Sequence, residues 1–263
     1  MTYVGGKGGA GVAQTIINQQ PPHTSYIEPF LGGGSVMLAK RPAAFNLGID
    51  LDPDPIDNFA GAARLDHIFY CQCGIAFLET DARALEPAAL IYCDPPYPFG
   101  ARRRNRRLYR CELNDVDHRR ILRAIQDLRC MVQISSYWNP LYAEILEGWR
   151  LVRFMAQTRG GMMEECLWMN YPEPAALHDY RFLGANFRQR ERIKRKTDRW
   201  VKRIASLPQI ERTALFSAMS AALAENGAPG SRGVSGEPRR RIPAASTMSA
   251  IIDRAAPLQE MTT

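Results

Sequence analysis

Residues 91–100 read IYCDPPYPFG, an apolar run followed by an acid, two prolines and an aromatic residue. The run from Ala89 to Tyr92 is typical of the end of a buried strand, and the prolines prevent the strand from continuing because they have no N–H to donate. Asp94 and Tyr97 are therefore predicted at the carboxyl end of a strand, where open α/β sheets bind ligands. A proline turn with an acidic cap is the simpler alternative.

Strand-like and helix-like segments alternate around this stretch. Helices are predicted for residues 35–40 and from Asn114 onward, where apolar residues fall at helical spacing. Strands are predicted at residues 25–30, 44–50, 75–81, 90–93 and 131–135, followed by an antiparallel pair at 151–156 and 165–170. The alternation predicts an α/β fold with a mainly parallel sheet and an antiparallel edge.

The pattern changes after Pro174. We expect a first domain over residues 1–175 and a basic helical extension over 176–226, which Pro208 breaks into two helices. Residues 227–263 are rich in Gly, Pro, Ser and Arg and have few large apolar residues. We expect this tail to be disordered, because it buries too little surface to offset its ordering entropy.

Composition limits the class of protein. A chain of 263 residues with 46% hydrophobic content can bury one substantial core with a small appendage. No run approaches the ~18 apolar residues of a membrane span, and the amino terminus lacks the apolar core of a secretory signal. The six cysteines include no C-x-x-C pair. We therefore expect reduced thiols in a cytoplasmic protein without a structural metal.

The net charge of +7 is concentrated in two segments. Residues 98–110 hold six arginines and no acid, and residues 181–203 hold ten basic and two acidic residues. The rest of the chain is net acidic. An acidic body with two basic patches predicts a polyanion as partner, and two solvated faces are the alternative.

Glycines and acids point to a small-molecule site. The turn FLGGG at residues 30–34 is neither a dinucleotide fingerprint nor a P-loop. Asp50, Asp81 and Asp94 are expected at the ends of three successive strands, so that three carboxylates meet at one sheet edge. Such acids favour a ligand with many donors and a positive centre, such as a sulfonium attached to an adenosine. They would repel a pyrophosphate.

The order of these motifs resembles the Dam-like DNA N6-adenine methyltransferases, particularly their phage and prophage branch. The matching elements are YVGGKGG, YIEPFLGGGSVML, LGIDLDP, TDARAL, IYCDPPY, ISSYWNP and ECLWMNYP, and they cover roughly residues 3–172. The resemblance implies a Rossmann-like methyltransferase fold with S-adenosyl-L-methionine as cofactor.

The resemblance also implies roles for single residues around the cofactor. Asp50 would hold the ribose, Asp81 would lie beside the adenine ring, and Asp94 would complete the site. Tyr3 and Lys7 would close over the cofactor from the amino-terminal segment. The pocket for its methionine part would be shaped by Glu28, Phe30, Gly32 and Gly34.

The D-P-P-Y tetrapeptide, Asp94 to Tyr97, has a physical rationale. An exocyclic adenine amine is a poor nucleophile because its lone pair is delocalised into the ring. The Asp94 carboxylate and the Pro95 carbonyl can each accept one of its N–H bonds and aim the lone pair at the methyl group. Pro95 and Pro96 stiffen these acceptors, and Tyr97 would stack on a base flipped out of the duplex.

One departure from the family concerns DNA recognition. Dam-like enzymes usually carry a large recognition insert before this strand, but only 12 residues separate Asp81 from Asp94. Double-stranded DNA is therefore expected to contact the loop at 98–115 and the basic carboxyl-terminal helices. The candidate contacts in the loop are Arg102, Arg103, Arg104, Arg106, Arg107 and Arg110.

Simpler readings exist for several single residues. Lys7 is equally well explained as a surface lysine, and Trp168 is expected in the core. His118 is expected on a solvated helix face. Ser135 to Tyr137 can be no more than the end of a strand.

The leading prediction is a site-specific, S-adenosylmethionine-dependent DNA adenine-N6 methyltransferase. Methylation of cytosine N4, RNA adenine or a glutamine amide is the alternative enzyme activity. By the resemblance, an aspartate rather than a serine at position 94 argues against cytosine, and the basic patches argue against a small protein loop. A DNA-binding protein that has lost catalysis is the remaining alternative, and the intact motifs count against it.

Overall fold

The computed structural model describes residues 6–9, 11–60, 67–102, 107–158 and 161–226. The chain forms two compact units that meet in sequence between Phe182 and Leu183, and each is described by itself. The predicted tail at 227–263 lies outside the described residues.

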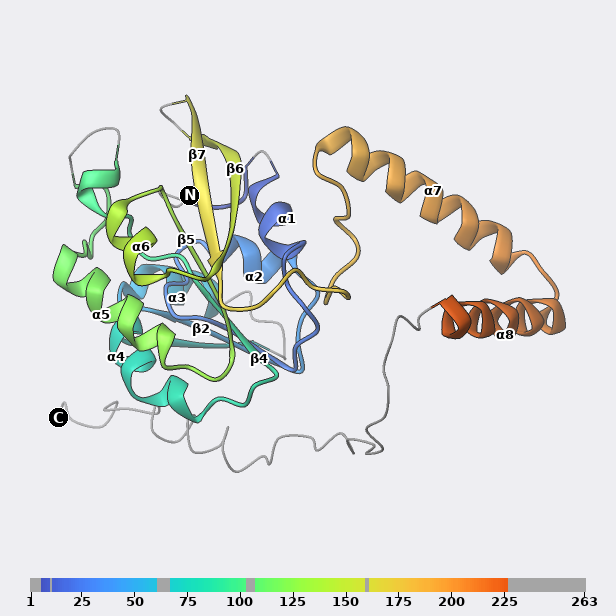
Figure 1. Cartoon of the computed structure of the whole chain (residues 1–263), viewed down its shortest axis with the longest axis horizontal. Coiled ribbons are helices and arrows are strands. Elements are labelled where there is room, and N and C mark those ends of the chain that lie inside the picture. Colours follow the sequence, from blue (N-terminus) through green and yellow to red (C-terminus); the bar gives the residue numbers. More distant parts are fainter. Residues whose placement is uncertain (1–5, 10, 61–66, 103–106, 159–160, 227–263) are drawn as a thin grey trace. The chain divides into compact units, whose positions relative to one another are not determined.

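A mixed sheet forms the centre of the first unit (Figure 1). Its seven strands among the described residues are β1 (Ser25–Glu28), β2 (Phe45–Asp50), β3 (His67–Cys71), β4 (Ala89–Cys93), β5 (Met131–Ser136), β6 (Arg150–Thr158) and β7 (Gly161–Met169). Their order is β3-β2-β1-β4-β5-β7-β6, with β1 to β5 parallel and β7 antiparallel to both of its neighbours. The predicted mainly parallel sheet with an antiparallel edge is confirmed.

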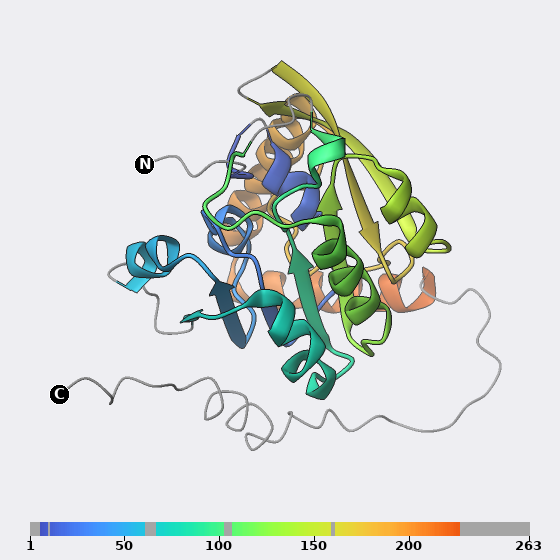
Figure 2. The same ribbon diagram turned by 90° about the vertical axis from the view of Figure 1, so that its left-hand side faces the viewer.

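Helices pack on both faces of this sheet (Figures 1 and 2). Alternate side chains of a strand point to opposite faces, so Tyr26 joins one core while Ile27 joins the other. The helices are α1 (Val12–Ile17), α2 (Ser35–Ala39), α3 (Pro53–Ala60), α4 (Gly74–Glu79), α5 (Asp115–Gln126) and α6 (Pro140–Ile145), with 3-10 turns η1 (Asp81–Ala84) and η2 (Phe99–Ala101). Trp168 lies in the core with α4, α5 and α6, as expected.

The predicted strand at residues 75–81 is wrong. These residues form α4 and η1, and the third strand is β3, which precedes them. β3 pairs only with β2 at the edge of the sheet, and most of its side chains are half-buried. Its sequence, HIFYC, has an apolar run much like that of the inner strand β4, ALIYC, while the similar short run in residues 75–78 forms a helix, because short apolar runs fit a strand or a helix equally well.

Helix α5 begins at a capping box. The Asn114 side chain accepts from the backbone nitrogens of Val116 and Asp117, and the Asp117 side chain accepts from the Asn114 nitrogen. His118 was expected to be solvated, but it is fully buried and lies 3.0 Å from the Tyr142 hydroxyl. It shares the buried face of the helix with Ile121, three residues further on.

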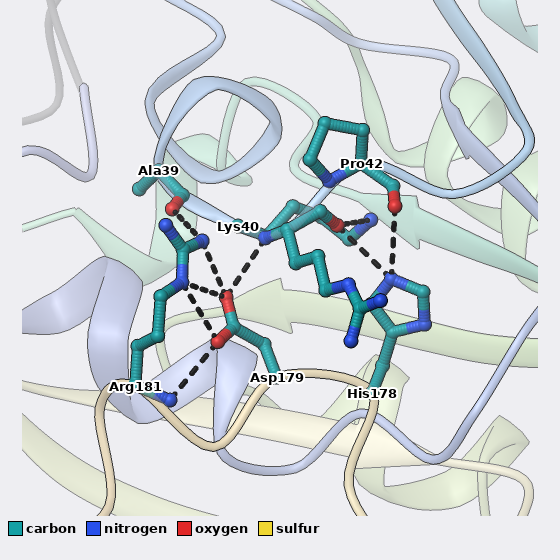
Figure 3. A network of polar contacts seen from close by, with 7 residues as sticks. Ala39, Lys40, Pro42, His178, Asp179 and Arg181 are labelled. Carbon is teal, nitrogen blue, oxygen red and sulfur yellow. Dashed lines mark hydrogen bonds and ion pairs between the residues drawn. The ribbon is translucent and has the colours of Figure 1, made fainter. Parts of the chain in front are cut away.

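After β7 the chain returns to the connection between α2 and β2 (Figure 3). Asp179 accepts a 2.8 Å hydrogen bond from the Arg41 nitrogen and pairs with Arg181. Arg181 also donates to the Ala39 carbonyl, and His178 Nε2 lies 3.0 Å from the Arg41 carbonyl oxygen. These contacts hold residues 178–182 on the first unit, which therefore extends beyond the predicted boundary at 175.

The second unit contains α7 (Phe187–Ala205) and α8 (Gln209–Asn226), which are separated at Pro208. The predicted carboxyl-terminal helices are confirmed. Asn186 caps α7 by accepting from the Gln189 nitrogen at 3.0 Å. The basic residues of α7 are largely exposed. Within the described ranges, every helix is too short or too polar to span a bilayer.

Candidate active site

A cavity opens at the carboxyl ends of β1, β2 and β4. Counted with its open mouth, it encloses about 850 Å³ of space between the lining residues. The predicted site residues in its lining are Lys7, Glu28, Phe30, Gly32, Gly34, Asp50, Asp94 and Pro96. Residues that the sequence did not single out also line it, among them Asp52, Cys73, Gly74, Tyr109 and Cys111.

The glycine turn after β1 forms one wall. Gly32 and Gly34 have φ angles of 48° and 56°, in the left-handed region that glycine adopts without strain. A Cβ on Gly34 would lie 2.7 Å from the Phe59 ring. A Cβ on Gly74 would lie 2.0 Å from the Pro29 carbonyl oxygen, so the start of α4 packs directly against the turn.

Asp50 fixes this turn from the end of β2. Its Oδ2 atom accepts a 2.7 Å hydrogen bond from the Gly32 nitrogen, and its Oδ1 atom accepts one from the Asp52 nitrogen at 2.9 Å. Burial raises the pKa of Asp50, and these two hydrogen bonds oppose the shift. The carboxylate therefore both faces the cavity and holds its wall in place.

Glu28 lies at the end of β1 and is buried. Its Oε1 atom accepts a 2.8 Å hydrogen bond from the Tyr26 hydroxyl. Burial raises the pKa of Glu28 to about 8, because desolvation disfavours the charged form. A cationic ligand in the cavity would favour its ionised form.

Asp94 follows β4 and is held by two donors. Its Oδ1 atom accepts a 2.8 Å hydrogen bond from the Ser135 hydroxyl and lies 3.0 Å from Lys7 Nζ. Ser135 also lies 3.0 Å from the Tyr92 hydroxyl. Ser135 is thus more than the end of a strand, because it orients the acid of the tetrapeptide.

Lys7 is buried, so the alternative interpretation of Lys7 as a surface lysine is wrong. Its ammonium contacts Asp94, the Glu165 carboxylate at 3.4 Å and the Tyr97 hydroxyl at 2.5 Å. Burial alone would lower the pKa of Lys7, but the two carboxylates outweigh it and raise that pKa. Lys7 is therefore a charged group at the centre of the site.

Tyr97 is not in the lining of the cavity. Its side chain is buried. The Tyr97 and Tyr137 rings pack edge-on with their centroids 4.7 Å apart, and Lys7 Nζ lies 4.6 Å from the centroid of the Tyr97 ring. A stacking base would therefore have to share this ring with neighbours that already contact it.

Asp81 is not in the lining of the cavity. It begins η1, and its Oδ2 atom accepts from the Thr80 hydroxyl at 3.2 Å. The prediction placed it at a strand end, and the helix α4 replaces that strand. Tyr3 lies outside the described residues.

The arginine-rich segment is only partly available for DNA. The Arg102 side chain is 3% exposed, donates to both Glu112 oxygens and donates to the Tyr97 carbonyl at 2.8 Å. A phosphate contact by Arg102 is therefore at odds with the structure. Arg110 pairs with Asp52 at 3.0 Å, and Arg107 is exposed. Arg103, Arg104 and Arg106 lie outside the described residues.

Two further features concern metals and thiols. In the part of the chain that the structure describes, no group of three or more His, Cys, Asp or Glu residues could hold a metal ion. All six cysteines are described, and all are free thiols.

Comparison of the whole structure with solved structures gives matches at low identity. A SAM-dependent methyltransferase from Agrobacterium tumefaciens is 14% identical with a TM-score of 0.41, over 60% of this chain and 58% of that one. An rRNA methylase from Streptococcus thermophilus is 9% identical with a TM-score of 0.38, over 60% and 92%. A precorrin 8w decarboxylase from Methanobacterium thermoautotrophicum is 13% identical with a TM-score of 0.40, over 64% and 94%. The sequence matches no protein-family model and no curated protein.

Proposed function

We propose that this protein is an S-adenosylmethionine-dependent methyltransferase that acts on an adenine amine in double-stranded DNA. The observation that carries the proposal is the cavity itself, which brings Asp50, Glu28 and Asp94 together beside a glycine turn. Lys7 is the only basic side chain among the described residues in its lining. The electrostatics therefore suit a nucleoside with a positive centre and disfavour a pyrophosphate.

The residues present fit that cofactor. Asp50 would accept from ribose hydroxyls with the lone pairs that Gly32 and Asp52 leave free. Glu28, buried at the end of β1, would meet the amino-acid part, and the glycine turn lets the backbone approach it. When bound, the cofactor supplies a methyl group on a sulfonium, whose sulfur accepts the electron pair of the broken C–S bond.

The tetrapeptide would act on the substrate amine. The Asp94 carboxylate and the Pro95 carbonyl each accept one N–H, which localises the nitrogen lone pair toward the methyl carbon. As the N–C bond forms, the nitrogen becomes positively charged and loses one proton. That proton leaves along the hydrogen bond to Asp94 and then reaches water, so the carboxylate is restored.

DNA would be gripped by exposed arginines, and Arg102 is not among them. Arg107 and the exposed basic residues of α7 are the candidates that the structure describes. Arginine and lysine on a surface neutralise phosphates without reading sequence, which suits non-specific affinity. Base reading would come from a subset of the loop arginines.

The proposal is tested with radiolabelled cofactor and three acceptors: duplex DNA, structured RNA and total bacterial protein. Label in DNA that appears as N6-methyladenine, and that Asp94→Ala abolishes, is the expected result. Label in RNA or protein alone would show that the protein is a methyltransferase whose substrate is not DNA. Methylation-sensitive sequencing of DNA from cells that express the protein would then report the target sequence.

A further inference from the structure

The Lys7 ammonium forms ion pairs with two carboxylates, those of Asp94 and Glu165. Lys7 Nζ lies 3.0 Å from Asp94 Oδ1 and 3.4 Å from Glu165 Oε2. The Asp94 side chain is 20% exposed and lines the cavity, whereas the Glu165 side chain on β7 is 6% exposed and is not in the lining. Glu165 Oε2 is buried, and the Lys7 ammonium is its ion-pair partner.

Lys7 occupies one of the two carboxylate oxygens that Asp94 offers to a substrate amine. A carboxylate oxygen has about two lone-pair sites, and Asp94 Oδ1 already meets two donors, Ser135 and Lys7, so an amine that binds at Oδ1 must displace one of them. Ser135 is buried on a central strand, whereas Lys7 reaches Asp94 with a long side chain. Lys7 is therefore the donor that an incoming amine would compete with.

A displaced ammonium needs another partner. A buried ammonium without one is strongly disfavoured, so Lys7 would otherwise stay on Asp94 and oppose the substrate. The Tyr97 hydroxyl at 2.5 Å is a neutral acceptor, whereas Glu165 at 3.4 Å is a second carboxylate that Lys7 contacts. A shift of Lys7 Nζ by about half an ångström would bring it to the ordinary length of a charged hydrogen bond with Glu165.

We propose that Glu165 is a positioning residue that retains the Lys7 ammonium when the substrate amine takes its place at Asp94. The assignment rests on the methyltransferase function proposed above.

The neighbouring residue supplies a matched control. Glu164 points to the opposite face of β7, is exposed and pairs with Arg153 at 3.2 Å. Glu164→Gln removes the same charge one position away without touching Lys7. Glu165→Gln alone can weaken the fold because it leaves a buried charge with one partner fewer. The double variant Lys7→Met/Glu165→Gln avoids this, because it removes both buried charges together.

The first measurement needs no substrate and no cofactor. The chain has only five lysines, Lys7, Lys40, Lys194, Lys196 and Lys202, so Lys7→Met identifies the side-chain NMR signal of Lys7. In Asp94→Asn, Lys7 should stay charged at neutral pH because Glu165 still holds it. In Asp94→Asn/Glu165→Gln, its pKa should fall below the ordinary lysine range. Equal titration of Lys7 in these two variants would overturn the proposal.

The second measurement follows base entry by fluorescence, with 2-aminopurine replacing the target adenine of a duplex. Glu165→Gln should lose the fluorescence rise and raise KM for DNA severalfold, and Lys7→Met/Glu165→Gln should regain the rise. Glu164→Gln should match the wild type. A full fluorescence rise in Glu165→Gln would refute the assignment. A wild-type protein that methylates no nucleic acid would refute the proposed function instead, whatever the NMR titration shows.

Discussion

The carboxylate of Asp50 and the backbone nitrogen of Gly32 lie 2.7 Å apart, and this hydrogen bond joins the end of β2 to the glycine turn after β1. The two segments are neighbours because β1 and β2 are paired in parallel. One acid thus has two tasks, to shape the turn and to face the cavity.

Asp50→Ala should therefore weaken cofactor binding by more than the loss of one contact. A hydrogen bond to the ribose is worth on the order of 1–3 kcal/mol when its partner stays buried, and the freed Gly32 nitrogen adds to the loss. Isothermal titration calorimetry measures the effect. Asp81 lies outside the lining, so Asp81→Ala should bind the cofactor with normal affinity. Equal weakening in both variants would contradict direct cofactor binding by Asp50.

Ser135→Ala should lower kcat and leave cofactor affinity unchanged. The Ser135 hydroxyl donates to Asp94 at 2.8 Å, and a hydrogen bond to a charged group contributes about 1.5–3 kcal/mol, which corresponds to roughly tenfold or more in rate. Steady-state kinetics with saturating cofactor measure it. Ser136→Ala is the control, because Ser136 is the adjacent buried serine on β5. A kcat that falls equally in both variants would point to a general packing effect.

Arg102→Ala should destabilise the fold instead of reducing DNA affinity alone. It leaves Glu112, whose side chain is 8% exposed, without its buried partner, and breaking such a pair costs about 3–5 kcal/mol. Urea denaturation followed by circular dichroism reports the free energy of unfolding. Arg107→Ala, on an exposed side chain, should change it by less than about 0.5 kcal/mol. An unchanged unfolding midpoint in Arg102→Ala would show that the pair contributes little.

The salt dependence of DNA binding should reveal which arginines contact phosphate. Replacing Arg192, Arg195 and Arg199 of α7 by Gln removes three exposed charges. Each lost phosphate contact should flatten the plot of log affinity against log salt by roughly 0.9. Fluorescence anisotropy at several salt concentrations measures the slope. A slope equal to that of the wild type would mean that this face of α7 is only solvated.

Stability should fall as pH rises because of Glu28. Its pKa is about 8 in the folded protein, against the ordinary value of 4.5. Between these two values the folded state binds more protons than the unfolded state, so the free energy of unfolding decreases with pH across this window. Glu28→Gln, which stays neutral, should flatten that decrease in urea melts from pH 5 to pH 8. The exposed Glu86→Gln should leave the profile as it is; a flattened profile in both would exclude Glu28 as the source.

The inner part of the sheet could be predicted from the sequence because its strands are buried on both faces. β4 reads as an unbroken apolar run, and its prolines mark the end of the strand. The edge strand β3 was missed because a short apolar run fits a strand or a helix equally well, and the strand was assigned to the run that forms α4. The buried position of His118 was readable, because it lies at helical spacing from Ile121 and Leu122.

Some residues of the candidate site could also be predicted from the sequence, and others could not. Residues at strand ends, such as Asp50 and Asp94, follow from the rule that ligands bind at the carboxyl edge of a parallel sheet. Glu165 could not be placed, because its partner Lys7 is distant in sequence and only the folded chain brings them together. The sequence marks Glu165 only as an acid directly before the apolar run CLWM in β7.

The ion pair between Arg102 and Glu112 closes a segment of the chain at its base, directly beside the Tyr97 carbonyl. Because this closure is buried, the carbonyl end of the tetrapeptide is tied directly to the Arg102–Glu112 pair. In the methyltransferase proposed above, sequence changes in the stretch between Arg102 and Leu108 should alter DNA contacts before they alter the tetrapeptide. Exchanging the stretch is therefore the change by which we would expect target preference to be redirected.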